Sequence, residues 1–178
     1  MSVFEYNFEQ YKSLSPDLYR KEKYNLQVEL LKLQEDVIKK KRKIAICFEG
    51  RDTAGKSSTI NFFSEHLIPS NFKYVHLGIP TKKERKNWFE RYETYLPNKG
   101  EIVLFDRSWY TRALTEPTLG YCSKKQYEEF MTKVNKWEKS LVKQGTELVK
   151  FYFSIDKDQQ KRRINARKNS KLKYWKLS

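Results

Sequence analysis

The stretch that decides the fold is Lys43–Ser57, which reads KIAICFEGRDTAGKS. Residues 43–48 form a short apolar run that stops before Gly50, as a buried parallel strand does. Gly50–Ser57 matches the pattern G-x-x-x-x-G-K-[ST] in full, and residues 55–67 favour a helix. A strand before this pattern and a helix after it are the context of a phosphate-binding P-loop. The sequence therefore predicts a P-loop that binds a nucleotide or a polyphosphate chain.

Each part of this loop has a physical role. The glycines allow the backbone to curl so that successive N–H groups point at phosphate oxygens, and the helix that follows adds the positive end of its dipole. Lys56 supplies a mobile cation for the outer phosphates, and the Ser57 hydroxyl is a ligand for Mg²⁺. The residues that we predict to bind phosphate are Gly50, Arg51, Thr53, Ala54, Gly55, Lys56, Ser57 and Ser58.

Two acidic residues are candidates for the metal and for catalysis. Asp52 lies inside the loop, where a carboxylate would repel phosphate unless a cation stands between them. Asp106 follows the apolar run 102–105 directly, so a strand would aim it at the metal beside the loop. We predict that Asp52, Ser57 and Asp106 hold Mg²⁺, and that Asp52, Lys56 and Asp106 are catalytic. Asp52 could instead position an incoming phosphate acceptor, or simply face solvent.

Basic residues follow both the predicted Asp106 strand and the last predicted strand. Arg107 and Arg112 could stabilise charge on a transferring phosphoryl group, and we count both as catalytic. A structural ion pair is an equal alternative for Arg112. Arg163 and Arg167 lie four residues apart in a basic helix at 157–168, so they share one face. We predict that this helix is a lid over the phosphates; a solvated charged face is the alternative.

The rest of the chain alternates helices and strands. A helix begins at Ser15-Pro16 and runs to about residue 41, with an apolar stripe that we expect to pack on the domain. Further strands are expected at 73–77, 101–105 and 147–155, and further helices at 82–95 and after a capping box at 123–126. The apolar positions expected in the first and last of these helices are Leu26, Leu30, Leu33 and Val37, and Tyr127, Phe130, Met131, Val134, Trp137 and Leu141.

This alternation predicts an α/β fold, a three-layer sandwich of the P-loop NTPase type with a parallel sheet, helices on both faces and a helical lid. Residues 1–178 suit one domain, with 1–42 as an N-terminal helical extension and 157–178 as the start of the basic lid region. The long first helix could pack against a second copy, so we expect a homo-oligomer.

Composition limits the partners and the compartment. The 37 Lys and Arg exceed the 22 Asp and Glu, for a formal net charge of +15, which favours a polyanion. Charge alone does not choose among nucleic acid, an anionic membrane and polyphosphate. No apolar run approaches the ~20 residues of a membrane span, and the N-terminus MSVFEYNFEQ does not resemble a signal peptide. Cys47 and Cys122 read as thiols in a reducing cytoplasm.

The sequence resembles the second family of polyphosphate kinases. The matching stretches, in the family's order, are FEGRDTAGKSS (48–58), PTKKERKNWFERYETYLPNKGEIVLFDRSWYTRA (80–113), the turn at 120–122, Gln160-x-x-Arg163-x-x-x-Arg167 and YWKLS (174–178). Ser57-Ser58 departs from the two glycines common in the family. Family members continue for several tens of residues past the position of Ser178, so we expect the last strand and helices of the family domain to be missing.

The resemblance implies a P-loop kinase fold related to thymidylate kinases. It implies Mg²⁺-dependent phosphoryl transfer between polyphosphate and a nucleoside mono- or diphosphate. In this similarity Asp52 and Asp106 match the family's essential acids, and Lys56 its P-loop lysine. Arg107 and Arg112 match phosphate-contacting arginines, and the two arginines of the basic helix match lid residues.

Three alternatives remain open at this stage. An ATP-dependent nucleoside monophosphate kinase would have the same fold and loop. A nucleic-acid-binding P-loop protein would suit the charge, but we find no recognised binding module, so nucleic acid is not the expected partner. A chain that binds phosphate without turnover is the third.

Overall fold

A parallel four-stranded sheet forms the centre of the molecule in this computed structural model, which describes residues 14–172 and 174. The strand order is β2-β3-β1-β4. The predictions for MSVFEYNFEQ and for Trp175–Ser178 lie outside the described residues. The strands are β1 (Lys43–Gly50), β2 (Phe72–Val75), β3 (Glu101–Asp106) and β4 (Thr146–Phe153).

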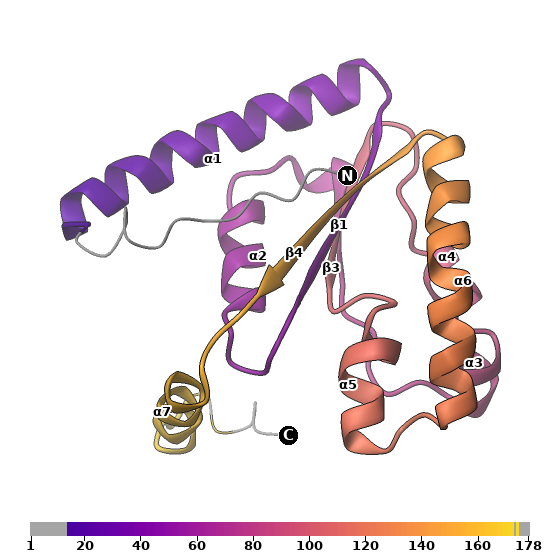
Figure 1. Ribbon diagram of the computed structural model, residues 1–178. Helices are drawn as coiled ribbons and strands as arrows, with labels where there is room; N and C mark the ends of the chain where they lie inside the picture. Colours follow the sequence, from indigo (N-terminus) through magenta and orange to yellow (C-terminus); the bar gives the residue numbers. More distant parts are fainter. Residues whose placement is uncertain (1–13, 173, 175–178) are drawn as a thin grey trace.

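The two faces of the sheet are covered by different helices, which confirms the predicted layers (Figure 1). On one face lie α1 (Pro16–Lys39) and α2 (Lys56–Ser64). On the other lie α3 (Lys82–Lys86), α4 (Glu90–Glu93), α5 (Thr111–Leu119) and α6 (Lys124–Lys143). A 3₁₀ turn, Pro69–Asn71, leads into β2, and α7 (Lys157–Lys168) follows β4. Within the described part of the chain, no helix combines the length and apolarity needed to cross a bilayer.

The apolar run in β1 is explained by the helices that cover both faces of this strand. Alternate residues point to opposite faces of a strand. Ile44, Ile46 and Phe48 join the core beneath α1 and α2, whereas Ala45 and Cys47 join the core beneath the other helices. Because both faces are covered, residues 44–49 are all buried, as in other two-sided parallel sheets.

The predicted helix 82–95 is wrong: the segment forms two short helices, α3 and α4. Asn87 leaves the helical region, at φ −111° and ψ 61°, and ends α3. The break lets Trp88 enter the core, where its indole N–H donates to the carbonyl oxygen of Trp109 at 2.9 Å. Tertiary packing of this tryptophan thus overrides the helical pattern.

The expected apolar stripe of α1 is only partly used. Val37 is buried, but Leu26 is 63% exposed, and the amides of Gln27 and Gln34 face inward instead. Gln34 both donates to and accepts from the backbone of Ile68, at 3.0 and 2.7 Å. The helix is therefore held to the connection between α2 and β2 by amide hydrogen bonds as well as by apolar contact.

Other boundaries differ by a few residues. Strand β2 ends at Val75 instead of residue 77, β4 runs from 146 to 153 instead of 147 to 155, and α2 ends at Ser64. In α6, Met131 is 46% exposed, so it does not belong to the core face that we predicted. The capping boxes at Ser123 and Thr81 place the starts of α6 and α3.

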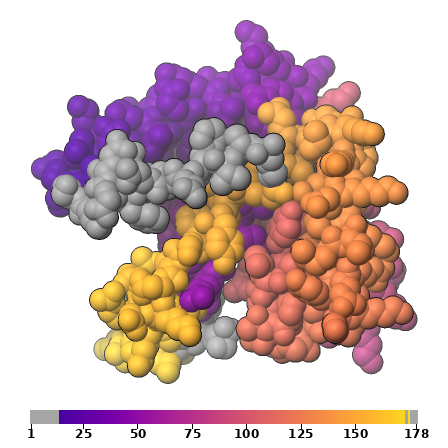
Figure 2. Space-filling view, in the orientation of Figure 1, coloured from indigo at the N-terminus to yellow at the C-terminus, as the bar shows by residue number. Residues whose placement is uncertain are grey.

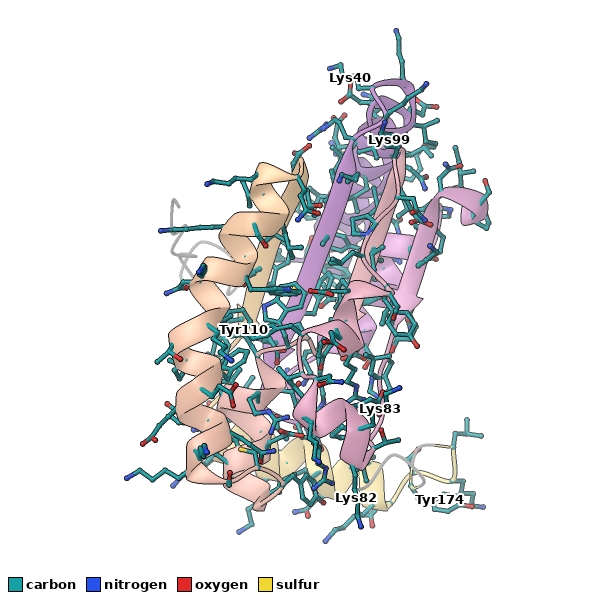
Figure 3. The ribbon with its side chains drawn as sticks, turned by 90° about the vertical axis from the view of Figure 1, so that its right-hand side faces the viewer. Lys40, Lys82, Lys83, Lys99, Tyr110 and Tyr174 are labelled. Atoms are coloured by element: carbon teal, nitrogen blue, oxygen red, sulfur yellow. The ribbon has the colours of Figure 1, made fainter. Side chains whose placement is uncertain are left out.

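The connections leave β1 and β3 in opposite directions, through α2 toward β2 and through α5 and α6 toward β4. In such sheets, ligands bind at the carboxyl ends of the two strands where the direction reverses. Figure 3 shows the two ends of the sheet: Lys40 and Lys99 mark the end where β1 and β3 begin, and Lys82 and Lys83 lie at the opposite end.

Candidate phosphate-binding site

The predicted P-loop curls over the carboxyl end of β1. Gly50 has φ +136°, and a Cβ there would lie 2.3 Å from the carbonyl oxygen of Phe153, so only glycine fits. Gly55 has φ +110° and is the residue before α2. Thr53 also adopts a positive φ, 64°, which is unusual for a residue with a side chain. The curl of the loop thus depends on positive φ angles at Gly50, Thr53 and Gly55.

Lys56 begins α2 and folds back beneath the loop. Its Nζ donates to the carbonyl oxygens of Gly50 and Arg51, both at 2.9 Å. Burial lowers the pKa of this ammonium, and the neighbouring Arg107 lowers it further. A polyanion above the loop would oppose both effects by favouring the charged form.

The strand-end acid and the loop hydroxyl are in direct contact, as the sequence predicted for a shared site. The Oγ of Ser57 donates to Oδ2 of Asp106 at 2.6 Å. Tyr74 of β2 donates to the same oxygen at 2.9 Å. Burial, followed by the charge of Asp106, raises the pKa of Tyr74 to about 12, so this phenol remains a donor at neutral pH. Ser58 is exposed on the first turn of α2.

A buried acid supports the segment after Asp106. Glu49, in β1, accepts hydrogen bonds from the backbone N–H and the hydroxyl of Ser108, at 2.5 and 2.8 Å. Burial raises the pKa of Glu49. Arg107, which lies between Asp106 and Ser108, has φ +67°, and its N–H donates to the carbonyl oxygen of Phe48 at 3.1 Å. These bonds fix the turn that presents the Asp106 carboxylate.

The predicted lid helix reaches the loop. Arg163 donates to the carbonyl oxygen of Thr53 at 2.9 Å, and Gln160 donates to that of Asp52 at 3.2 Å. Arg167 lies 3.4 Å from the Asp52 carboxylate, whose side chain is 38% exposed. Figure 2 shows α7 (yellow) as a separate lobe at the lower left of the molecule. One face of α7 therefore contacts the loop, as the spacing of its arginines indicated.

Arg112 is placed differently from the other predicted site residues. Its side chain is 1% exposed, and its Nε lies 3.1 Å from Oε2 of Glu116. Its Nη2 donates to the carbonyl oxygen of Arg85, and its guanidinium carbon lies 4.0 Å from the centre of the Trp88 ring. Its described hydrogen bonds and ion pairs include no P-loop residue. The structural ion pair that we left open for Arg112 is thus present. Arg107, by contrast, extends to the hydroxyl of Thr115 at 3.2 Å.

The oxygen atoms near the loop suit a magnesium ion. Mg²⁺ in kinases is held by one or two protein oxygens together with substrate phosphates and water. Ser57 and Asp106 supply such a hydroxyl and carboxylate, and Asp52 lies in the same loop. Among residues 14–172 and 174, no group of three or more His, Cys, Asp or Glu is placed to hold a metal ion.

Comparison with known proteins places the chain in a family. A family model described as Polyphosphate kinase 2 (PPK2) matches residues 13–178. The chain belongs to this family. A GDP-polyphosphate phosphotransferase of Pseudomonas aeruginosa is 45% identical over 161 residues, which are 90% of this chain and 45% of the relative. An ADP-polyphosphate phosphotransferase of the same species is 45% identical over 166 residues, covering 93% of this chain and 55% of the relative.

A solved structure agrees with this assignment. The crystal structure of polyphosphate kinase 2 from Arthrobacter aurescens superposes with a TM-score of 0.84 at 26% identity, covering 93% of this chain and 61% of that one. The fold of this PPK2 member is therefore that of its family. The chain spans about half the length of the phosphotransferases that it matches.

Sequence reasoning missed three contacts near the site. Glu49 could have been noticed as the charged residue directly before Gly50, after the apolar residues 44–48. Tyr74 and His76 gave no usable signal, because their positions depend on β2 lying beside β3. The His76 ring lies 3.2 Å from the carbonyl oxygen of Asp106.

Proposed function

We propose that this chain carries the catalytic loop of a polyphosphate:nucleotide phosphotransferase, which transfers a phosphoryl group between polyphosphate and a nucleoside mono- or diphosphate. The observation that carries the proposal is the contact of Ser57 with Asp106, at the reversal point of a P-loop sheet. Membership of the PPK2 family and the names of its relatives support polyphosphate as one substrate.

The proposed reaction is a direct transfer. A terminal phosphate oxygen of the nucleotide attacks the end phosphorus of polyphosphate. The bond from that phosphorus to its bridging oxygen breaks, so the chain shortens by one phosphate and the nucleotide gains one. Mg²⁺, when bound, would neutralise the oxygens of the transferring group. Ser57, Asp106 and Asp52 are the residues that we propose to hold it.

Lys56 would have to exchange partners during binding. Its Nζ now donates to two loop carbonyl oxygens. A phosphate oxygen above the loop would be a stronger, charged acceptor, so we propose that the ammonium turns to it. Arg107 lies beside Asp106 and would stabilise charge on the transferring group; Arg112, held by Glu116, would act by fixing α5 against the core.

The α7 helix is proposed as a lid. Its arginines already contact the loop at Thr53 and Asp52. With a polyanion bound, the side chains of Arg163 and Arg167 would turn toward its phosphates. The α7 helix would then cover the loop and exclude water from the reaction. Nucleic acid is not a proposed partner.

Assembly and location are proposed on separate grounds. The first half of α1 exposes Leu18, Tyr19, Tyr24 and Leu26, which supports packing against a second copy in a homo-oligomer. Light scattering of the Tyr24→Glu/Leu26→Glu variant should show a smaller particle. The free thiols Cys47 and Cys122 favour the reducing cytoplasm as the location.

The proposal is tested by incubating the chain with polyphosphate, Mg²⁺ and AMP, ADP or GDP, and measuring nucleotide products. We expect the next higher phosphate of at least one nucleotide, and no product from Asp52→Asn. A second arm supplies ATP and nucleoside monophosphates. Products in this arm alone would assign an ATP-dependent kinase, and loop-dependent binding without product would assign a non-catalytic phosphate-binding chain.

A further inference from the structure

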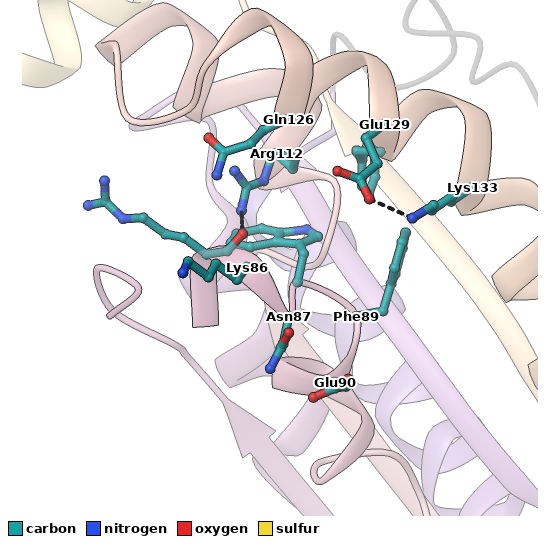
Figure 4. A pocket seen from close by; sticks show the side chains of 11 residues that line it. Lys86, Asn87, Phe89, Glu90, Arg112, Gln126, Glu129 and Lys133 are labelled. Atoms are coloured by element: carbon teal, nitrogen blue, oxygen red, sulfur yellow. Dashed lines mark hydrogen bonds and ion pairs between the residues drawn. The ribbon is translucent and has the colours of Figure 1, made fainter. Parts of the chain in front are cut away.

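A pocket lies on the side of the sheet that α3 to α6 cover. It opens between the α3–α4 segment and α6 and has a volume of about 200 Å³. Its floor includes Trp88 and the guanidinium of Arg112. Figure 4 shows Arg112 beside Gln126 at one end of the pocket, with Lys86 of α3 across from them. Phe89 and the Glu129–Lys133 pair form the other end.

Of the residues that line this pocket, Arg112 has a buried side-chain nitrogen without a hydrogen-bond partner, and its neighbours Arg91 and Glu116 lie outside the lining. Five buried side-chain atoms of the described residues lack a hydrogen-bond partner, and four of them belong to Arg91, Arg112 and Glu116. The Nη1 of Arg112 is one of the four, although the side chain is 1% exposed. Buried donors without partners are rare in proteins, and a bound molecule is one explanation for them. The remaining isolated atom is Oγ1 of Thr53, in the P-loop.

The end of the pocket near Arg112 offers donors. The Oε1 of Gln126 accepts from the N–H of Ser123 at 2.9 Å in the capping box, which leaves the amide NH₂ to donate. Lys86 is exposed and adds an ammonium group. Glu129, on the opposite side, is held by Lys133 at 2.5 Å. A guanidinium N–H, an amide N–H and an ammonium together match the oxygens of a small anion.

We propose that this pocket binds a small phosphate oxyanion, orthophosphate or pyrophosphate, separately from the P-loop. The Nη1 of Arg112 and the NH₂ of Gln126 donate to its oxygens, and Lys86 neutralises its charge. A volume of about 200 Å³ is below the ~300 Å³ at which pockets for drug-sized ligands begin, which favours a small anion. The inference does not rest on the proposed phosphotransferase activity.

The test removes the competing P-loop first. In a Lys56→Ala background, orthophosphate and pyrophosphate are titrated separately by calorimetry, and the Trp88 indole N–H is followed by NMR. We expect one saturable site for at least one of the two anions and a concentration-dependent shift of the Trp88 signal. No shift of that signal with either anion would overturn the proposal.

Matched variants then locate the site. Gln126→Glu keeps the capping-box acceptor but places a carboxylate at the donor end, and it should weaken binding tenfold or more. Lys86→Gln should weaken it about two- to fivefold, as for an exposed charge. Thr132→Glu adds the same charge elsewhere on α6, and Lys83→Gln removes a lysine of α3 outside the pocket. Both controls should bind within twofold of the background; equal weakening by the controls would contradict a built site.

Discussion

Two clusters of charged residues, one around Asp106 at the end of β3 and one around Arg112 in α5, differ in how their polar atoms are hydrogen-bonded. Around Asp106, the carboxylate accepts from Ser57 and Tyr74, both partly open to solvent. Around Arg112, the guanidinium and Glu116 are almost fully buried, and although they form an ion pair, Nη1 of Arg112 and both Glu116 oxygens lack hydrogen-bond partners. The open cluster can exchange its existing hydrogen bonds for a ligand, whereas in the buried cluster Nη1 of Arg112 is the donor left to bind one. Asp106 is itself only 3% exposed, so the exposure of its hydrogen-bond partners, rather than of the charged group, separates the two clusters.

The largest effect is expected at the open cluster. Asp106→Asn should reduce phosphotransferase activity by about a thousandfold, in the range found when one electrostatic contact to a transition state is removed. Denaturation in urea should change little, because the amide can still accept from Ser57. An equal loss of activity and of stability would mean that Asp106 acts structurally.

The buried cluster should respond in the opposite way. Arg112→Ala leaves the Glu116 carboxylate buried without its cation, and the free energy of unfolding should fall by about 3–5 kcal/mol. Arg112→Met/Glu116→Leu replaces both charges with apolar groups and should recover most of that loss. Urea denaturation measures both. A single variant as stable as the parent would show that the ion pair contributes nothing.

The lid contacts test whether the loop needs α7. Arg167→Gln should lower kcat/KM for polyphosphate about tenfold, the effect of one charge-assisted hydrogen bond. Stability should change by less than ~0.5 kcal/mol, as for other exposed ion pairs. Arg162→Gln is the control, because the described contact of Arg162 is with Gln159 of the same helix. Similar kinetics for the two variants would argue against a lid.

The hydrogen bond from Tyr74 to Asp106 can be tested separately from the one that Ser57 donates. Tyr74→Phe removes one of its two donors and should raise the Mg²⁺ concentration needed for half-maximal rate a few-fold, since the carboxylate loses an orienting bond. The pKa of Tyr74 is about 12, above its ordinary 10.0. The donor is therefore present below pH 10 and is lost only as pH rises through 12. If the apparent Mg²⁺ affinity of the variant is unchanged, Tyr74 has no role in binding the metal.

The smallest effect is expected at an ion pair far from both clusters. Arg42 bonds to Glu147 and Asp36 at 2.7 Å and lowers the pKa of both carboxyls. For Asp36 the hydrogen bond from Lys40 contributes most. Stability from Glu147 is thus present above its ordinary pKa of 4.5 and lost as pH falls. Glu147→Gln should cost less than ~1 kcal/mol at pH 7 and flatten acid unfolding below pH 4.5.

Much of the fold and of the open cluster followed from local sequence. The P-loop and the strand ending in Asp106 are short patterns with strict chemistry, and the structure places them together. The helices α3 and α4 and the exposed Leu26 did not follow, because Trp88 and the α1 amides find partners far away in the chain. The catalytic roles of the site residues and the metal remain predictions.

The sequence by itself determined the loop, the two-sided strands and the family, because these depend on residue types at fixed short spacings. Only the tertiary structure decided that Arg112 is buried against Glu116, that Tyr74 shares the Asp106 carboxylate and that α7 reaches Asp52. Each of these contacts joins segments brought together by strand order and helix packing. These contacts cannot be read from spacing along the chain, because they form only when helices pack on both faces of the sheet.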